Sequence, residues 1–160
     1  MIYGYSDGAT SNNEKGKGIG GIGWLILDEK ENIVSYGADH ISNTTNNECE
    51  LLALITLCHE IVRELDPVDA ALIYSDSAYC INCYEQKWWS KWENNGWINS
   101  KKEPVKNREL WEQLLPFFKD SRLTFRKTKS HSDDKWNNMV DRLAVEAKMI
   151  FLEEINDRHL

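Results

Sequence analysis

Four carboxylates stand where an open sheet with helices would bring acids together. Asp7 and Asp76 each end a predicted strand, and neighbouring parallel strands present their carboxyl ends at one edge of a sheet. Glu50 and Asp141 lie in the first turns of two predicted helices, from which their side chains could point to the same edge. Bare anions so close would repel one another. A hard divalent cation with oxygen ligands, Mg²⁺ or Mn²⁺ rather than zinc, would relieve that repulsion.

Each of these acids also has an ordinary structural explanation: a turn former after a strand, a favourable charge at a helix start, or surface charge. The whole set, in an alternating order of strands and helices, is much less accidental. His131 lies in the polar segment 130–134, ten residues before Asp141. A loop histidine beside a metal centre can move a proton or assist product release, and we expect that role for His131.

Hydrophobic periodicity predicts the elements that would position these acids. Strands are predicted over 2–7, 19–27, 33–40, 70–74 and 123–127. Helices are predicted over 47–65, 77–86 and 88–95, from a cap at Asn107 to about 118, and from 137 to about 155. This order predicts an α/β fold: a mixed five-stranded sheet, with three antiparallel strands followed by two parallel strands and with helices on both faces. The glycines of 18–23 indicate a strand that other backbones approach closely.

Charge is unevenly distributed along the chain. The net charge of −7 over 160 residues argues against a uniformly basic nucleic-acid binder. Residues 87–129, however, hold eleven basic and five acidic residues, a net charge of +6, together with five of the seven tryptophans, while the rest carries −13. Cations interleaved with aromatic rings suit a phosphate backbone and its sugars or bases. A solvated, Trp-anchored pair of helices would give the same pattern.

Length and composition bound the class of protein. A chain of 160 residues with 41% hydrophobic residues predicts a single domain over 1–160. No apolar run approaches the roughly 20 residues that cross a bilayer, and the N-terminus lacks signal-peptide features. We therefore expect a cytoplasmic location, no membrane association, no obligate protein partner and a monomer. Cys80 and Cys83 have the spacing of a redox or zinc motif, but we interpret all four cysteines as buried free thiols.

Six motifs then carry a resemblance to a known family. They are residues 6–9 (Ser-Asp-Gly-Ala), the glycine-rich 18–23, residues 44–51 (Thr-Thr-Asn-Asn-Glu-Cys-Glu-Leu), residues 75–79 (Ser-Asp-Ser-Ala-Tyr), the Trp-rich 88–111, and Lys129-Ser130-His131 with Asp141 ten positions on. With these motifs in this order, the sequence resembles a type 1 ribonuclease H from Tyr3 to about Lys148. The resemblance implies an endonuclease that hydrolyses the RNA strand of RNA/DNA hybrid duplexes and leaves 5′-phosphate and 3′-hydroxyl ends.

The resemblance also implies a role for particular residues. Asp7, Glu50, Asp76 and Asp141 would be catalytic and would hold two Mg²⁺ ions, with Mn²⁺ as a substitute; His131 would be the family's loop histidine. Two such ions, about 4 Å apart, can activate a water and stabilise the leaving 3′-oxygen. Substrate contacts are implied for Gly8 and Asn13 (RNA strand), Thr45, Asn46 and Asn47 (minor groove), and Trp88, Trp92 and Asn107 (DNA strand). The last three belong to a basic protrusion over 87–111, the handle.

Two departures from the family's pattern bear on affinity. Ala78 stands where many relatives have Gln, and Glu93-Asn94-Asn95 stands where basic residues are commoner. Both predict weaker binding, and the second predicts a shallower dependence on salt. Two other functions stay open: a binding module that kept the fold without the chemistry, and another nuclease or transposase-type phosphoryl transferase. The four carboxylates argue against the first, and the handle with residues 45–47 argues against the second.

Overall fold

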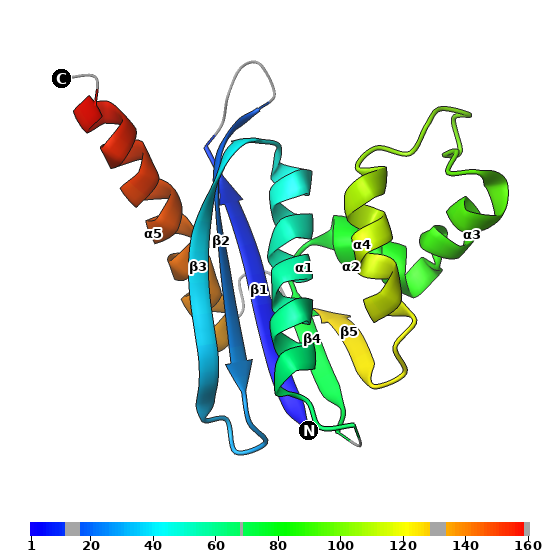
Figure 1. Ribbon diagram of the computed structural model, residues 1–160, viewed down its shortest axis with the longest axis horizontal. Coiled ribbons are helices and arrows are strands. Elements are labelled where there is room, and N and C mark those ends of the chain that lie inside the picture. The colour runs from blue at the N-terminus through cyan, green and yellow to red at the C-terminus, as the bar shows by residue number, and fades with distance from the viewer. Residues whose placement is uncertain (12–16, 68, 129–133, 159–160) are drawn as a thin grey trace.

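A mixed sheet forms the centre of the computed structural model, which describes residues 1–11, 17–67, 69–128 and 134–158 (Figure 1). Its strands are β1 (Ile2–Thr10), β2 (Gly18–Leu27), β3 (Ile33–Thr44), β4 (Ala71–Ser75) and β5 (Leu123–Lys127), in the spatial order β3-β2-β1-β4-β5. β1, β2 and β3 pair antiparallel, whereas β4 is parallel to β1 and β5 is parallel to β4. The predicted mixed sheet is confirmed.

Helices cover both faces of the sheet, as predicted. They are α1 (Asn46–Glu64), α2 (Ala78–Gln86), α3 (Trp88–Asn95), α4 (Arg108–Phe118) and α5 (Lys135–Arg158). α1 lies across one face with α2 and α4 beside it, and α5 lies against the opposite face (Figure 1). Among the described helices, none combines the length and the hydropathy needed to span a membrane.

The two largest clusters of buried apolar residues lie on opposite faces of the sheet. The larger one lies under α1, α2 and α4 and includes the fully buried Leu54, Ile73 and Trp111. The smaller one lies under α5 and joins Tyr5, Leu25, Leu27 and Val140. Burying one such large apolar side chain contributes about 1.5–3 kcal/mol. The strand segments that carry the candidate site are therefore fixed by packing on both faces.

Two boundaries that bear on the candidate site, and the exposure of one residue, differ from the sequence-based prediction. β1 does not end at Asp7 but continues to Thr10, because β2 keeps pairing with it after its last pair with β4, Ser6 with Ser75. α5 begins at Lys135, so Asp141 lies in its second turn. The spacing of apolar residues along this helix would put Ile150 on its inner face, yet Ile150 is 57% exposed. The adjacent Phe151 stacks on His40 of β3 with ring centroids 3.9 Å apart, so α5 still lies against the sheet here and Ile150 faces away from it.

All four cysteines are free and buried, which confirms the interpretation as ordinary thiols. Burial raises the pKa of Cys49 and of Cys83 to about 12. Thiols that stay protonated at neutral pH are poor nucleophiles and poor metal ligands.

Candidate active site

Three different elements bring the predicted carboxylates together. Asp7 lies one residue past the last β1–β4 pair, and Asp76 follows the last residue of β4, so the two are neighbours across parallel strands. Glu50 lies on α1, which begins at this end of the sheet. Thr45 fixes that start, because its side-chain oxygen accepts a hydrogen bond from the backbone N–H of Glu48 at 3.1 Å.

Asp7, Glu50 and Asp76 form a tight carboxylate cluster. One oxygen from each lies within 4.8 Å of the others. Only 4% of Asp7 and 8% of Glu50 are exposed to solvent. Asp141 is exposed and lies outside this cluster, but it is close enough to Asp7 to interact with it by a hydrogen bond and by charge. The structure thus gathers the four acids with Asp7 at the centre, and it places Asp141 at the rim.

Burial and mutual repulsion disfavour the ionised form of the carboxyl groups in the cluster. Burial, then the charges of Glu50 and Asp76 and an interaction with Asp141, raise the pKa of Asp7 to about 10. Burial and the charge of Asp76 raise the pKa of Glu50 to about 8, against an opposing contribution from the Gly8 N–H. Without a cation, the cluster therefore holds a proton at neutral pH.

The cluster fits a divalent metal ion. The Oε2 atom of Glu50 is buried and has no hydrogen-bond partner among the described residues. A buried acceptor without a partner costs free energy, and a bound cation would satisfy it. All three donors are carboxylate oxygens, which suit Mg²⁺ or Mn²⁺ better than softer metals.

The predicted minor-groove residues lie at the start of α1. Thr45 is the N-cap, and Asn46 accepts a hydrogen bond from the Thr10 hydroxyl at 3.3 Å. Asn46 and Asn47 are exposed. Their amides can both donate and accept hydrogen bonds. Gly8, predicted to touch the RNA strand, donates its N–H to Asp7 Oδ1 at 2.9 Å.

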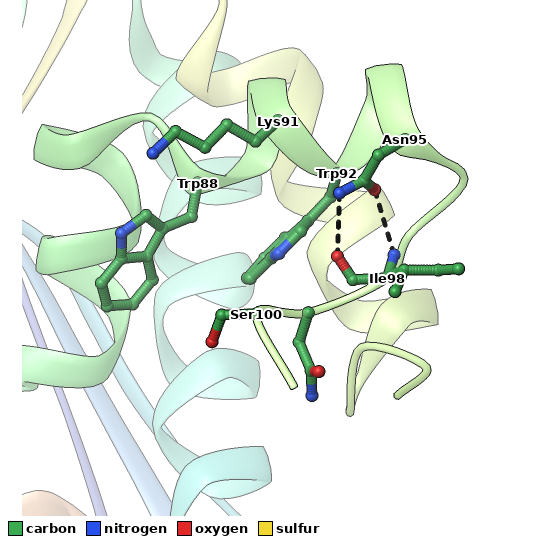
Figure 2. Close-up of a pocket in the computed structure, with 7 residues that line it drawn as sticks. Trp88, Lys91, Trp92, Asn95, Ile98 and Ser100 are labelled. Carbon is green, nitrogen blue, oxygen red and sulfur yellow. Dashed lines mark hydrogen bonds between the residues drawn. The ribbon is translucent and has the colours of Figure 1, made fainter. Parts of the chain in front are cut away.

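The other predicted substrate residues that the structure describes line a cavity beside α1. A cavity of about 210 Å³ is lined by Asn47 of α1, Tyr79 of α2, Trp88 and Trp92 of α3, and Asn107. A second cavity, of about 440 Å³, shares both tryptophans and continues toward residues 98–100. In Figure 2, the rings of Trp88 and Trp92 and the Ser100 side chain lie around this second cavity. The Asn95 side chain donates one hydrogen bond to the Ile98 carbonyl oxygen and accepts another from the Ile98 N–H.

Asn107 is placed in a way that the sequence did not predict. It precedes α4 with a left-handed φ of 61°, but its side chain does not cap the helix. Instead its Nδ2 donates to the Tyr79 hydroxyl oxygen at 3.1 Å, and Trp111 Nε1 donates to the same oxygen at 3.2 Å. Asn107 is thus the N-cap residue of α4, as predicted, but its side chain makes no capping hydrogen bond. Tyr79, which orients Asn107, was missed, although the motif of residues 75–79 contains it.

Glu93, the acid at the tip of the handle, is exposed but pairs with a cation of α4. Lys119 of α4 donates to Glu93 at 3.0 Å, and its ammonium also lies 5.8 Å from the centre of the Trp89 ring. Because Glu93 is neutralised by α4, it repels an approaching phosphate less than the sequence alone suggests. Ala78 is exposed. Two predicted site residues, Asn13 and His131, lie outside the described residues.

Comparison with known proteins agrees with this geometry. The family model for RNase H matches residues 2–149. A protein named ribonuclease H from Caldicellulosiruptor saccharolyticus is 41% identical over 140 residues, covering 88% of this chain and 90% of the relative. Another, from Clostridium botulinum, is 40% identical over 145 residues, covering 89% and 92%. The chain belongs to the ribonuclease H family.

Solved structures share the fold. The crystal structure of LC11-RNase H1 in complex with RNA/DNA hybrid is similar with a TM-score of 0.70 at 25% identity, covering 95% of this chain and 99% of that one. RNase H1 from the halophilic archaeon Halobacterium salinarum is similar with a TM-score of 0.64 at 22% identity, covering 91% and 96%.

Proposed function

We propose that this protein is an endonuclease that hydrolyses the RNA strand of RNA/DNA hybrids and leaves 5′-phosphate and 3′-hydroxyl ends. The observation that carries the proposal is the cluster of Asp7, Glu50 and Asp76 within 4.8 Å, in a chain of the ribonuclease H family. A nearby hollow lined by tryptophans and asparagines supports binding of a nucleic-acid strand.

Asp7, Glu50, Asp76 and Asp141 are the residues proposed to hold two Mg²⁺ ions, with Mn²⁺ as a substitute. When bound, such ions activate a water and stabilise charge on the phosphate and the leaving oxygen. Asp7 stands at the centre of the four acids, and its Oδ1 is already oriented by the Gly8 N–H. His131 is proposed to move a proton between this centre and solvent.

The substrate is proposed to lie across α1 and the handle. Asn46 and Asn47 are exposed at the start of α1, where their amides can read 2′-hydroxyls, which distinguish RNA from DNA. Trp88 and Trp92 offer rings to the sugars or bases of the other strand. Backbone and shape recognition of this kind carries little sequence specificity. LC11-RNase H1, a related protein, was solved with such a hybrid.

A cleavage assay tests the proposal. Labelled RNA/DNA hybrid, RNA/RNA and DNA/DNA duplexes are incubated with the protein, with and without Mg²⁺. We expect cleavage of the RNA strand of the hybrid only, dependent on the metal and abolished by Asp7→Asn. Equal activity of Asp7→Asn and the unmodified protein would overturn the assignment. Binding without cleavage would support the non-catalytic module, and cleavage of duplex DNA would support the transposase-type alternative.

The monomeric state, the absence of an obligate partner and the cytoplasmic location stay predictions. Light scattering during size-exclusion chromatography tests the first two, with a mass of 18.6 kDa expected. Cell fractionation tests the third.

A further inference from the structure

Two glycines adjoin Asp7 in the sheet. Gly8 follows it on β1, and Gly23 lies opposite it on β2 in the antiparallel register. A side chain at Gly8 would meet α1, and a side chain at Gly23 would meet α5, so the two positions face opposite sides of the sheet. α1 carries Glu50, and α5 carries Asp141.

At Gly8, the backbone of β1 lies directly against the backbone of α1. A Cβ atom built there would lie 2.9 Å from the carbonyl carbon of Cys49 and 3.0 Å from both the Cys49 oxygen and the Glu50 nitrogen. These α1 atoms cannot rotate away as the end of a side chain can. Only a residue without a side chain lets α1 lie this close to β1 beside Glu50.

The contact at Gly23 is equivalent on the other face. A Cβ atom there would lie 2.6 Å from the Val140 carbonyl oxygen, next to Asp141, and 3.0 Å from the Ala144 nitrogen. Gly21, two residues earlier on the same face, would bring a Cβ atom to 1.9 Å from the Ala144 oxygen. The backbone of α5 thus rests directly on β2 on both sides of Asp141.

We propose that Gly8 and Gly23 are positioning residues for the metal site: they set how closely α1 and α5 approach the sheet and thereby place Glu50 and Asp141 around Asp7. This inference rests on the proposed metal binding. Its physical basis is the narrow tolerance of Mg²⁺, which requires nearly ideal octahedral geometry with ligand distances of about 2.0–2.1 Å. A Cβ atom 2.9 Å from the α1 backbone at Gly8, or 2.6 Å from the α5 backbone at Gly23, requires the helix to shift by several tenths of an ångström, whereas metal–ligand distances tolerate about 0.2 Å.

Gly4 provides a matched control on the same strand and face as Gly8. A Cβ atom there would lie 2.5 Å from Ile61 Cδ1 and 3.2 Å from Leu57 Cδ1, which are the ends of flexible side chains. Gly4→Ala therefore costs packing near the C-terminal half of α1 and leaves the turn with Glu50 in place. The comparison separates a general loss of packing from a displaced carboxylate.

The experiment measures the rise in unfolding temperature with Mg²⁺ in the absence of any hybrid, since a ligand that binds only the folded state stabilises it by RT ln(1 + [L]/Kd), from which the Kd is obtained. Leaving out the hybrid also removes the RNA contact implied for Gly8. For Gly8→Ala and Gly23→Ala, we expect the Kd for Mg²⁺ obtained from these shifts to rise by about 10- to 100-fold, the usual effect of losing support for metal ligands. Gly4→Ala should keep the unmodified Mg²⁺ response at a lower unfolding temperature. With hybrid present, kcat at fixed Mg²⁺ should fall for the first two variants only.

Each outcome decides between the possibilities. No Mg²⁺ response of the unmodified protein would overturn the proposed metal site itself. A Mg²⁺ response in Gly8→Ala and Gly23→Ala equal to that of Gly4→Ala would overturn the positioning role while leaving the metal site intact. A variant without a cooperative unfolding transition would overturn the role of its glycine, because that contact would then be a condition of folding.

Discussion

Replacing Asp7 by Asn should stabilise the metal-free protein while it abolishes activity. Asn keeps the size of the side chain and an oxygen that can accept the Gly8 N–H, which donates to Asp7 Oδ1 at 2.9 Å. It removes the charge that burial and the neighbouring acids disfavour. Stability and activity therefore change in opposite directions at this one residue.

The magnitude follows from the two pKa values of Asp7. The pKa rises from 3.8 to about 10 on folding, so the folded state binds one more proton than the unfolded state between these values. Each pH unit in that range lowers the free energy of unfolding by about 1.4 kcal/mol. Between about pH 4 and about pH 7, the free energy of unfolding of the unmodified protein therefore falls by roughly 4 kcal/mol through this residue, and that of Asp7→Asn does not. The effect should vanish below about pH 4, where Asp7 is protonated in both states.

Urea denaturation in the presence of a chelator tests this, with the free energy of unfolding measured from about pH 4 to about pH 8. Asp157→Asn, at the exposed end of α5, is the control for removing one negative charge from an acidic chain. Mg²⁺ should narrow this difference at neutral pH, since only the unmodified protein gains stability from binding, and should cancel it at a concentration of about 1,000 times the Kd. The reasoning is refuted if Asp7→Asn is no more stable than the unmodified protein at neutral pH, or if its effect does not change with pH.

Three further predictions concern the handle and the start of α1. Trp88→Ala should raise KM about tenfold with little change in kcat, because stacking on an aromatic ring is worth about 1–3 kcal/mol; steady-state kinetics on a hybrid would contradict this by a large fall in kcat at unchanged KM. Glu93→Gln should lower the free energy of unfolding by only about 0.5 kcal/mol, since its pair with Lys119 is partly exposed, and the salt dependence of KM should steepen slightly. A shallower dependence would contradict the placement of Glu93. Thr45→Ala should destabilise the protein by about 1 kcal/mol through loss of the α1 cap, whereas Thr45→Ser should not; equal stability of the two variants in urea would refute the role of the hydroxyl.

Much of the fold could be predicted because its signals are local. The three- and four-residue spacing of apolar residues defined α1, and the short apolar run before Asp76 defined β4. Turns, caps and periodicity depend on residues close in the sequence, so the order of elements and the mixed sheet followed. Boundaries were less accurate where a distant strand decides them, as at β1, which continues past Asp7 because β2 pairs with it.

The candidate site shows where local signals end. Residue types at strand ends and helix starts were enough to select the four acids and the tryptophans. Only the tertiary structure decided that Asp7 and Glu50 are buried against each other while Asp141 is exposed at the rim. It also directed the side chain of Asn107, the N-cap residue of α4, to Tyr79 instead of to the helix, and it paired Glu93 with Lys119. These outcomes depend on contacts between residues that are far apart in the sequence.

The glycine-rich strand β2 shows both what the sequence predicted and what only the tertiary structure decided. Its composition alone predicted a strand that other backbones approach closely. Which backbone approaches, from which face and beside which carboxylate was decided by the packing of α5 on β2 at Gly23. The sequence determined the chemistry available to this protein. The tertiary structure determined the distances, burial and charges under which that chemistry operates, because these depend on which elements pack against one another.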